Sequence, residues 1–279
     1  MNSNASKKEK VNGVIKALIA FVVGLVILKG MEAITPRFIS DSVIYQIVDE
    51  LVFASVITVF VIIYRRSYIW KPDLSGIKGV ILPGLVFLIP AIFSLIGYWK
   101  TIEITDKTYD IVLAIIFFLL IGVAEESLFR GILQNAFHDY FGEDTRAHVI
   151  MAIVLASLIF GAMHLTNAFS PDIPFSAALS QAVGAAGLGL VLGTIYFRAH
   201  KCIWVNVILH AINDGVAFVV GGMLTGKSAF KLIGGTGVAG QDRGIPAMLG
   251  GLVLYLLVFL VIARKKKIVP LLNSGANEP

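Results

Sequence analysis

Apolar segments about as long as a membrane is thick recur along this sequence and restrict it to a bundle of membrane-spanning helices. Hydrophobic residues make up 57% of the 279 residues and charged residues only 15%, too apolar for an ordinary water-soluble domain. A helix needs about 20 apolar residues to cross a bilayer. The predicted spans are 14–28, 43–64, 79–99, about 109–140, 147–164, 175–197, 202–220 and 245–263. We therefore predict an all-α, polytopic integral membrane protein with about eight transmembrane helices, forming a single membrane domain over residues 1–279.

The positive charges indicate how this bundle is oriented. Eight spans place both termini on one side, and the loops on that side carry 14 Lys and Arg residues, against seven in the opposite loops. Cytoplasmic loops of membrane proteins are enriched in Lys and Arg. Both termini are therefore predicted to be cytoplasmic, in the cell membrane if the source is microbial, and the net charge of +5 is interpreted as topology rather than nucleic-acid binding.

The fourth span carries charges where a membrane helix rarely has them. The stretch 122–130, GVAEESLFR, follows the apolar run 111–121, and each charge there costs about 2.5–3.5 kcal/mol. Glu126 and Arg130 are one helical turn apart and can neutralise each other. Glu125 is turned about 100° away and has no cation at helical spacing. The paired acid is interpreted as structural and Glu125 as chemical. Asp49 and Glu50, in the second span, receive no assignment.

Two more predicted helices carry polar residues at helical spacing. Phe160 and His164 are one turn apart on the fifth span, and Asn206, His210 and Asp214 form a stripe on the seventh. Such a stripe is expected to face protein or a water-filled cavity. If the fourth and fifth spans form a hairpin about the turn 142–146, Glu125 and His164 lie at similar heights.

These residue types suit hydrolysis of an amide by activated water. A desolvated glutamate can act as a general base, and a neutral histidine can help to orient the water. A second histidine can donate a hydrogen bond to the developing oxyanion. The sequence therefore predicts an intramembrane catalytic cavity. The other histidines, His138, His148 and His200, are expected to be solvated near loops.

The three motifs together resemble the CPBP family, which comprises type II CAAX prenyl endopeptidases and bacterial relatives linked to bacteriocin processing and self-immunity. The residues that carry the resemblance, over roughly residues 109–220, are Glu125, Glu126 and Arg130 (EExxxR), Phe160 and His164 (FxxxH), and His210 and Asp214 (HxxxN/D). The resemblance implies an intramembrane glutamic-type endopeptidase without metal or cofactor. Its substrate would be a membrane-associated protein or peptide, prenylated CAAX proteins being one class.

The same resemblance implies the roles of the residues. Glu125 and His164 would activate water, His210 and Asp214 would stabilise the oxyanion, and Glu126 and Arg130 would support the site. Phe160 and Asn206, which lie on the same helices as the two histidines, are predicted as further supporting residues. An ionised Asp214 cannot donate a hydrogen bond. It must be protonated, or orient His210 while Asn206 or Asn213 supplies a donor.

Three other functions are compatible with these residues. A zinc peptidase could use Glu125, His164 and His210 as ligands, although no HExxH motif occurs. A proton-coupled transporter could relay protons through the same groups, although no inverted repeat is evident. A non-catalytic immunity or scaffold protein could keep the motifs for folding. The lipid bilayer is an expected partner and nucleic acid is not, while the oligomeric state is left open.

Overall fold

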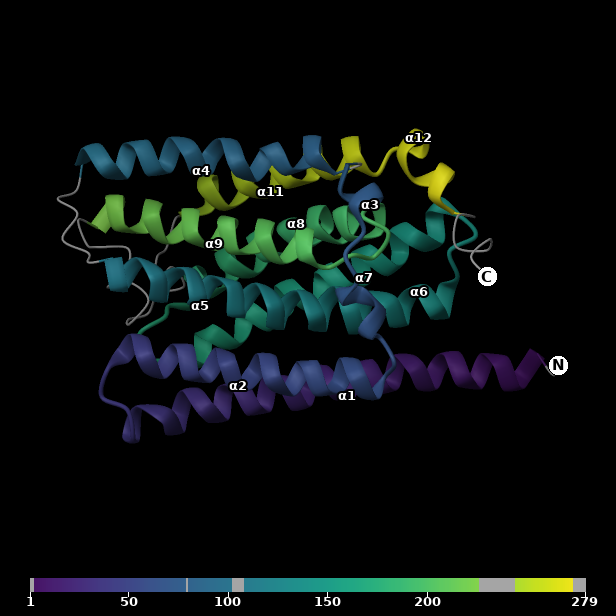
Figure 1. Ribbon diagram of the computed structural model, residues 1–279, viewed down its shortest axis with the longest axis horizontal. Helices are drawn as coiled ribbons and strands as arrows, with labels where there is room; N and C mark the ends of the chain where they lie inside the picture. The colour runs from purple at the N-terminus through teal and green to yellow at the C-terminus, as the bar shows by residue number, and fades with distance from the viewer. Residues whose placement is uncertain (1–2, 79, 102–107, 226–243, 273–279) are drawn as a thin grey trace.

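The computed structural model describes residues 3–78, 80–101, 108–225 and 244–272, and these form a bundle of long, roughly aligned helices (Figure 1). The α-helices are α1 (Ser3–Ile34), α2 (Ser42–Ile63), α3 (Leu74–Lys78), α4 (Ile81–Thr101), α5 (Thr108–Glu126), α6 (Asn135–Phe141), α7 (Arg146–His164), α8 (Phe175–Arg198), α9 (Trp204–Thr225), α11 (Gly244–Ile262) and α12 (Lys265–Ile268). A π-helical segment, η3 (Ser127–Gln134), joins α5 to α6, and short 3-10 helices are η1 (Thr35–Arg37), η2 (Ser67–Trp70), η4 (Leu165–Phe169) and η5 (Val269–Leu271).

The predicted class, an all-α polytopic membrane protein, is confirmed. Among the described residues six helices are long and apolar enough to cross a membrane. The pair Met248–Ile262 and Lys265–Leu271, bent by 60°, gives a seventh, and Ile81–Gly97 of α4 is a shorter apolar helix. All eight predicted spans are thus helices, with ends within a few residues of those expected, apart from α1, which extends well beyond its apolar run.

Small residues of α8, among them Gly189 and Gly193 one helical turn apart, allow it to pack closely inside the bundle. A Cβ on Gly189 would lie 2.9 Å from the Ser157 Cβ of α7, and one on Gly193 would lie 2.7 Å from Gln134 Oε1 of η3. A side chain at either position would push neighbouring atoms aside. The glycine pair therefore serves internal packing of α8 against α7 and η3.

The turn between α6 and α7 is the hairpin turn that the sequence predicts. Gly142 has a φ of 91°, which suits a residue without a Cβ. Thr145 then caps α7 by accepting a hydrogen bond from the His148 amide at 3.2 Å. This turn sends α7 back along the motif-bearing helix and returns the histidine at its far end to the depth of Glu125.

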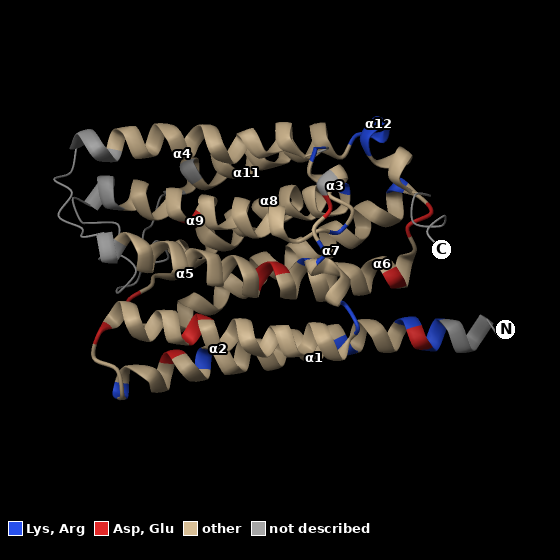
Figure 2. Ribbon diagram, viewed as in Figure 1, with Lys and Arg blue, Asp and Glu red and all other residues tan. Residues whose placement is uncertain are grey.

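The first residues of α1 and the helix α12 lie at the same end of the bundle (Figure 1). Figure 2 shows Lys and Arg gathered at this end, while acidic residues also lie within the bundle on α5 and α2. Since residues 70 and 170 are separated by three crossings, namely α4, the α5–α6 segment and α7, reporter fusions at these positions should report opposite sides, with residue 70 cytoplasmic. Two reporters on the same side would contradict this topology.

Candidate active site

The motif-bearing segment changes its helical geometry directly after the two glutamates. Glu125 and Glu126 end α5, and every residue of the π-helical segment that follows is buried. π-Helical stretches are rare and are frequent at functional sites. Two amides at its far end anchor it to α8: Gln134 Nε2 donates to the Gly193 carbonyl at 3.0 Å, and Asn135 Nδ2 donates to Tyr196 Oη at 2.7 Å. The glutamates are thus held on a fixed, buried support.

Glu126 is completely buried and makes contacts with three side chains. The predicted ion pair is present, with Arg130 Nε 3.1 Å from Glu126 Oε2. The same oxygen accepts from Asn206 Nδ2 at 2.9 Å, and Oε1 lies 2.7 Å from His210 Nδ1. A buried carboxylate is tolerated when charge and hydrogen bonds compensate it, as they do here. Glu126 therefore joins the motif segment to α9.

Phe160 has a definite place in this support. The Arg130 guanidinium lies over its ring, 5.0 Å from the centroid, and the Phe129 ring packs 4.8 Å away. His164 and His210 approach the same ring edge-on, at 5.1 and 5.8 Å between centroids. Phe160 thus shapes the walls around both histidines, and its contact with Arg130 adds a cation–π attraction.

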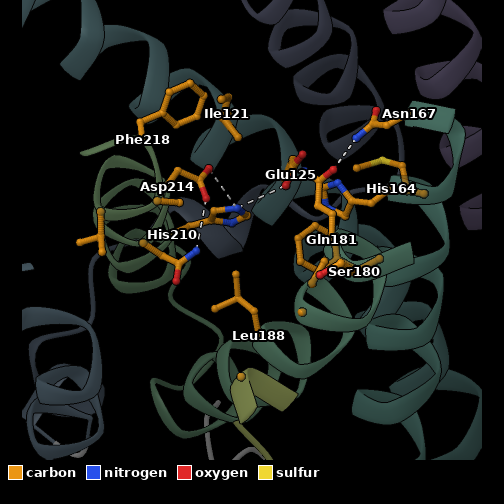
Figure 3. Close-up of a pocket in the computed structure, with 18 of the residues that line it drawn as sticks. Ile121, Glu125, His164, Asn167, Ser180, Gln181, Leu188, His210, Asp214 and Phe218 are labelled. Atoms are coloured by element: carbon orange, nitrogen blue, oxygen red, sulfur yellow. Dashed lines mark hydrogen bonds and ion pairs between the residues drawn. The ribbon is translucent and has the colours of Figure 1, made fainter. Parts of the chain in front are cut away.

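His210 is the centre of the polar cluster. Its Nε2 lies 3.3 Å from Glu125 Oε2 and 3.5 Å from Asp214 Oδ2 (Figure 3), while Nδ1 faces Glu126. An imidazolium donates from both ring nitrogens, which is the form that suits carboxylates on both sides. In that form His210 presents an N–H to the space between Glu125 and Asp214.

Asp214 and its neighbour Asn213 face the same cavity. Asn213 Nδ2 donates to Asp214 Oδ1 at 3.4 Å, and the Tyr255 hydroxyl of α11 donates to Asn213 Oδ1 at 3.0 Å. Asp214 therefore lies where an acceptor can orient His210, which is one of the two roles that the sequence leaves open.

Asn206 has a different position from the one considered for an oxyanion donor. Besides its bond to Glu126, Nδ2 donates to the Leu192 carbonyl at 2.8 Å. Both amide protons are thus used, and the side chain is buried. The suggestion that Asn206 donates a hydrogen bond to the oxyanion is therefore wrong. Asn206 supports Glu126 instead.

His164 borders the same cavity as Glu125 and Asp214 (Figure 3). Within the described part of the chain no side chain forms a hydrogen bond with it, so both ring nitrogens are open to water or substrate. Glu125 and His164 share the cavity without a direct hydrogen bond to each other in these residues. A water molecule can therefore lie between them.

The cavity has a volume of about 580 Å³, and the described residues that line it come from nine helical segments. Its polar lining combines the site residues with groups from α1, α2, η4 and α8, while α4, α9 and α11 contribute apolar walls. The lining includes Lys29, Glu32, Gln46, Glu50, Val86, Phe87, Glu125, Phe160, His164, Asn167, Gln181, Leu188, His210, Asn213, Asp214, Phe218, Leu254 and Tyr255. All four residues predicted as catalytic thus border one space of ligand size.

The expectation for the remaining histidines is wrong for one of them. His138 is buried against the Phe197 ring, and its Nε2 lies 3.3 Å from Gln134 Nε2. His138 is only four residues before the turn at Gly142, which is why the sequence predicts a solvated side chain. However, Phe197 of α8 covers the face of α6 that carries it. His148 and His200 are exposed and pair with Asp144 and Asp73, each at 2.7 Å. Outside the membrane spans, the Ser75 hydroxyl and the hydrogen bond with His200 help to hold the pKa of Asp73 well below its usual range.

Glu50 is the cavity residue that sequence reasoning did not assign. The signal was an acid in the middle of an apolar span. Its neighbour Asp49 is buried and accepts a hydrogen bond from Thr35 Oγ1 at 2.5 Å. Among the described residues no group of three His, Cys, Asp or Glu side chains is arranged to hold a metal ion.

Comparison with known proteins confirms the family resemblance. Residues 107–216 match the family described as type II CAAX prenyl endopeptidase Rce1-like, and this range contains every motif residue of α5, η3, α7 and α9 described above. A search of curated proteins finds no match.

Proposed function

Because residues 107–216 are Rce1-like and the chain is a multi-pass membrane protein, we propose that it is an intramembrane glutamic-type endopeptidase. Its substrate is a membrane-associated protein or peptide, of which prenylated CAAX proteins are one class. The observation that carries the proposal is the cavity bordered by Glu125, His164 and His210 inside the helix bundle. A carboxylate and two imidazoles around one space supply a base and a hydrogen-bond donor for amide hydrolysis.

The first step of the proposed reaction is activation of water. Glu125 and His164 border the same cavity, and a water bound there can give one proton to the Glu125 carboxylate while its other O–H donates a hydrogen bond to His164. The oxygen then attacks the carbonyl carbon of the scissile peptide bond. Glu125 holds the proton that it has taken and passes it to the leaving amine.

The second element is stabilisation of the tetrahedral oxyanion. The Nε2–H of His210 is directed to the space between Glu125 and Asp214, where a substrate carbonyl oxygen would approach. The hydrogen bond between Nδ1 and Glu126 keeps the imidazole in this orientation. The Asp214 carboxylate, 3.5 Å from His210 Nε2, attracts the imidazolium and so positions it, and in this role Asp214 need not act as a donor.

The experiment that tests this function is cleavage of a membrane-peptide library by the purified protein, beside Glu125→Ala. Activity of the wild-type protein that is absent from the variant supports the proposal. A folded wild-type protein that cleaves no peptide, while the same library is cut by an Rce1-like protease used as a positive control, would contradict it.

Hydrolysis is expected to survive strong chelation, since the proposed roles belong to Glu125, His164 and His210 themselves. The measurement compares turnover before and after dialysis against a chelator, with metal content determined on the same samples. Activity that is lost together with stoichiometric zinc, and is restored by zinc alone, would favour the alternative of a zinc peptidase.

A further inference from the structure

The cavity has an excess of acidic groups. Among the described residues its charged lining comprises Lys29 and the His210 imidazolium, against the four carboxyl groups of Glu32, Glu50, Glu125 and Asp214. Lys29 forms an ion pair with Glu32, in which Nζ lies 2.7 Å from Oε2. His210 lies against Glu125 and Asp214. Within the described part of the chain, these pairings leave the carboxyl group of Glu50 without a compensating charge.

Glu50 lies on α2, one turn after Gln46, and both side chains line the cavity. Its Oε2 atom is buried and accepts no hydrogen bond from the described residues. The carboxyl groups of Glu32, Glu125 and Asp214 line the same cavity as Glu50. A buried carboxylate among like charges is costly unless a cation neutralises it.

Asp49 differs from Glu50 in its position. The two acids are adjacent, yet helical geometry turns them about 100° apart. Asp49 Oδ1 accepts a hydrogen bond from the Thr35 hydroxyl, Oδ2 has no partner among the described residues, and the side chain does not line the cavity. Glu50 also lies outside residues 107–216, the range that matches the Rce1-like family.

We propose that Glu50 determines specificity by pairing with a cationic side chain, Lys or Arg, of the bound peptide. This inference rests on the proposed function and names its substrate class: membrane-associated peptides with a basic residue near the scissile bond. A low-dielectric cavity with excess negative charge attracts and orients such a group. The substrate cation supplies the counter-charge that the cavity lining lacks.

The test is a lysine scan. A single Lys is moved through each position around the scissile bond of a neutral, cleavable peptide, and norleucine, which lacks the charge, occupies the same position in the matched peptide. The wild-type protein should show kcat/KM at least about 10-fold higher for Lys than for norleucine at one position. Glu50→Gln should reduce this ratio to about 2-fold or less, and Glu50→Lys should prefer Glu there.

The matched control is Asp49→Asn, which removes a neighbouring carboxylate while its Oδ1 still accepts from Thr35. This variant should keep the preference for Lys. Glu50→Asp, which retains the charge, should keep the sign of the preference and replaces Glu50→Gln if that variant does not fold. A wild-type protein that cleaves all the peptides equally would overturn the inference, as would a preference for Lys that Glu50→Gln and Glu50→Lys leave intact.

Binding separates this inference from the proposed function. Non-cleavable analogues of the best Lys and norleucine peptides are titrated against Glu125→Gln, with and without Glu50→Gln. A preference for Lys in binding that depends on Glu50, without hydrolysis by the wild-type protein, would overturn the proposed function and keep the inference. Hydrolysis by the wild-type protein without any Glu50-dependent preference for Lys would keep the proposed function and overturn the inference about Glu50.

Discussion

Glu125→Gln should abolish peptide cleavage while the protein keeps its fold. Glutamine nearly preserves the volume of the side chain but cannot take a proton from water. General-base catalysis contributes about 10²–10⁴-fold, so turnover should fall by at least about this factor. The melting temperature in detergent should change little, because among the described residues the Glu125 carboxylate pairs only with His210 Nε2, at 3.3 Å. The measurement is cleavage and thermal melting on the same preparation.

Asp49→Asn is the control for loss of a membrane-buried carboxylate. It lies away from the cavity, so it should cleave peptide at nearly the wild-type rate. Wild-type turnover by Glu125→Gln, together with an inactive but normally folded Glu126→Gln, would exchange the roles of the two acids and refute the assignment made from the helical faces.

Glu126→Gln should mainly destabilise the protein. The change leaves Arg130 buried without its counter-charge, and breaking a buried ion pair costs about 3–5 kcal/mol. It also places an amide N–H₂ where Glu126 now accepts from both Asn206 and His210. The loss of the acceptor at His210 Nδ1 should lower turnover as well, through the orientation of the imidazole.

The double change Glu126→Gln with Arg130→Met should recover part of this stability, because no buried charge is then left unpaired. Methionine can still pack on the Phe160 ring that Arg130 now covers. Melting of the two single variants and the double variant completes the cycle. If the double variant loses more free energy of unfolding than the two single variants lose together, the unpaired charge is not the source of the destabilisation.

The sequence predicts the helices well because each carries its own signal. Apolar runs of membrane length end at charges or turns, so the bounds of α2, α7 and α8 differ from those expected by one residue at most. The Glu126–Arg130 pair follows from spacing within one helix, and it is present.

What the sequence does not predict depends on how the helices are rotated against one another. The contact of Glu126 with His210 requires α5 and α9 to present particular faces, and no periodicity specifies this. The π-helical geometry of η3 has no sequence signal that separates it from an α-helix. Likewise, the entry of Glu50 into the cavity depends on the packing of α2 against α5.

Cleavage of a peptide substrate in H₂¹⁸O under single-turnover conditions tests the central claim most directly. If Glu125 activates water, one ¹⁸O atom should appear in the new C-terminal carboxylate of the peptide fragment and none in Glu125, with chelator present throughout. Label in the Glu125 carboxylate would indicate a covalent acyl intermediate and contradict the proposed mechanism, and the same labelled fragment from Glu125→Gln would show that another group activates the water.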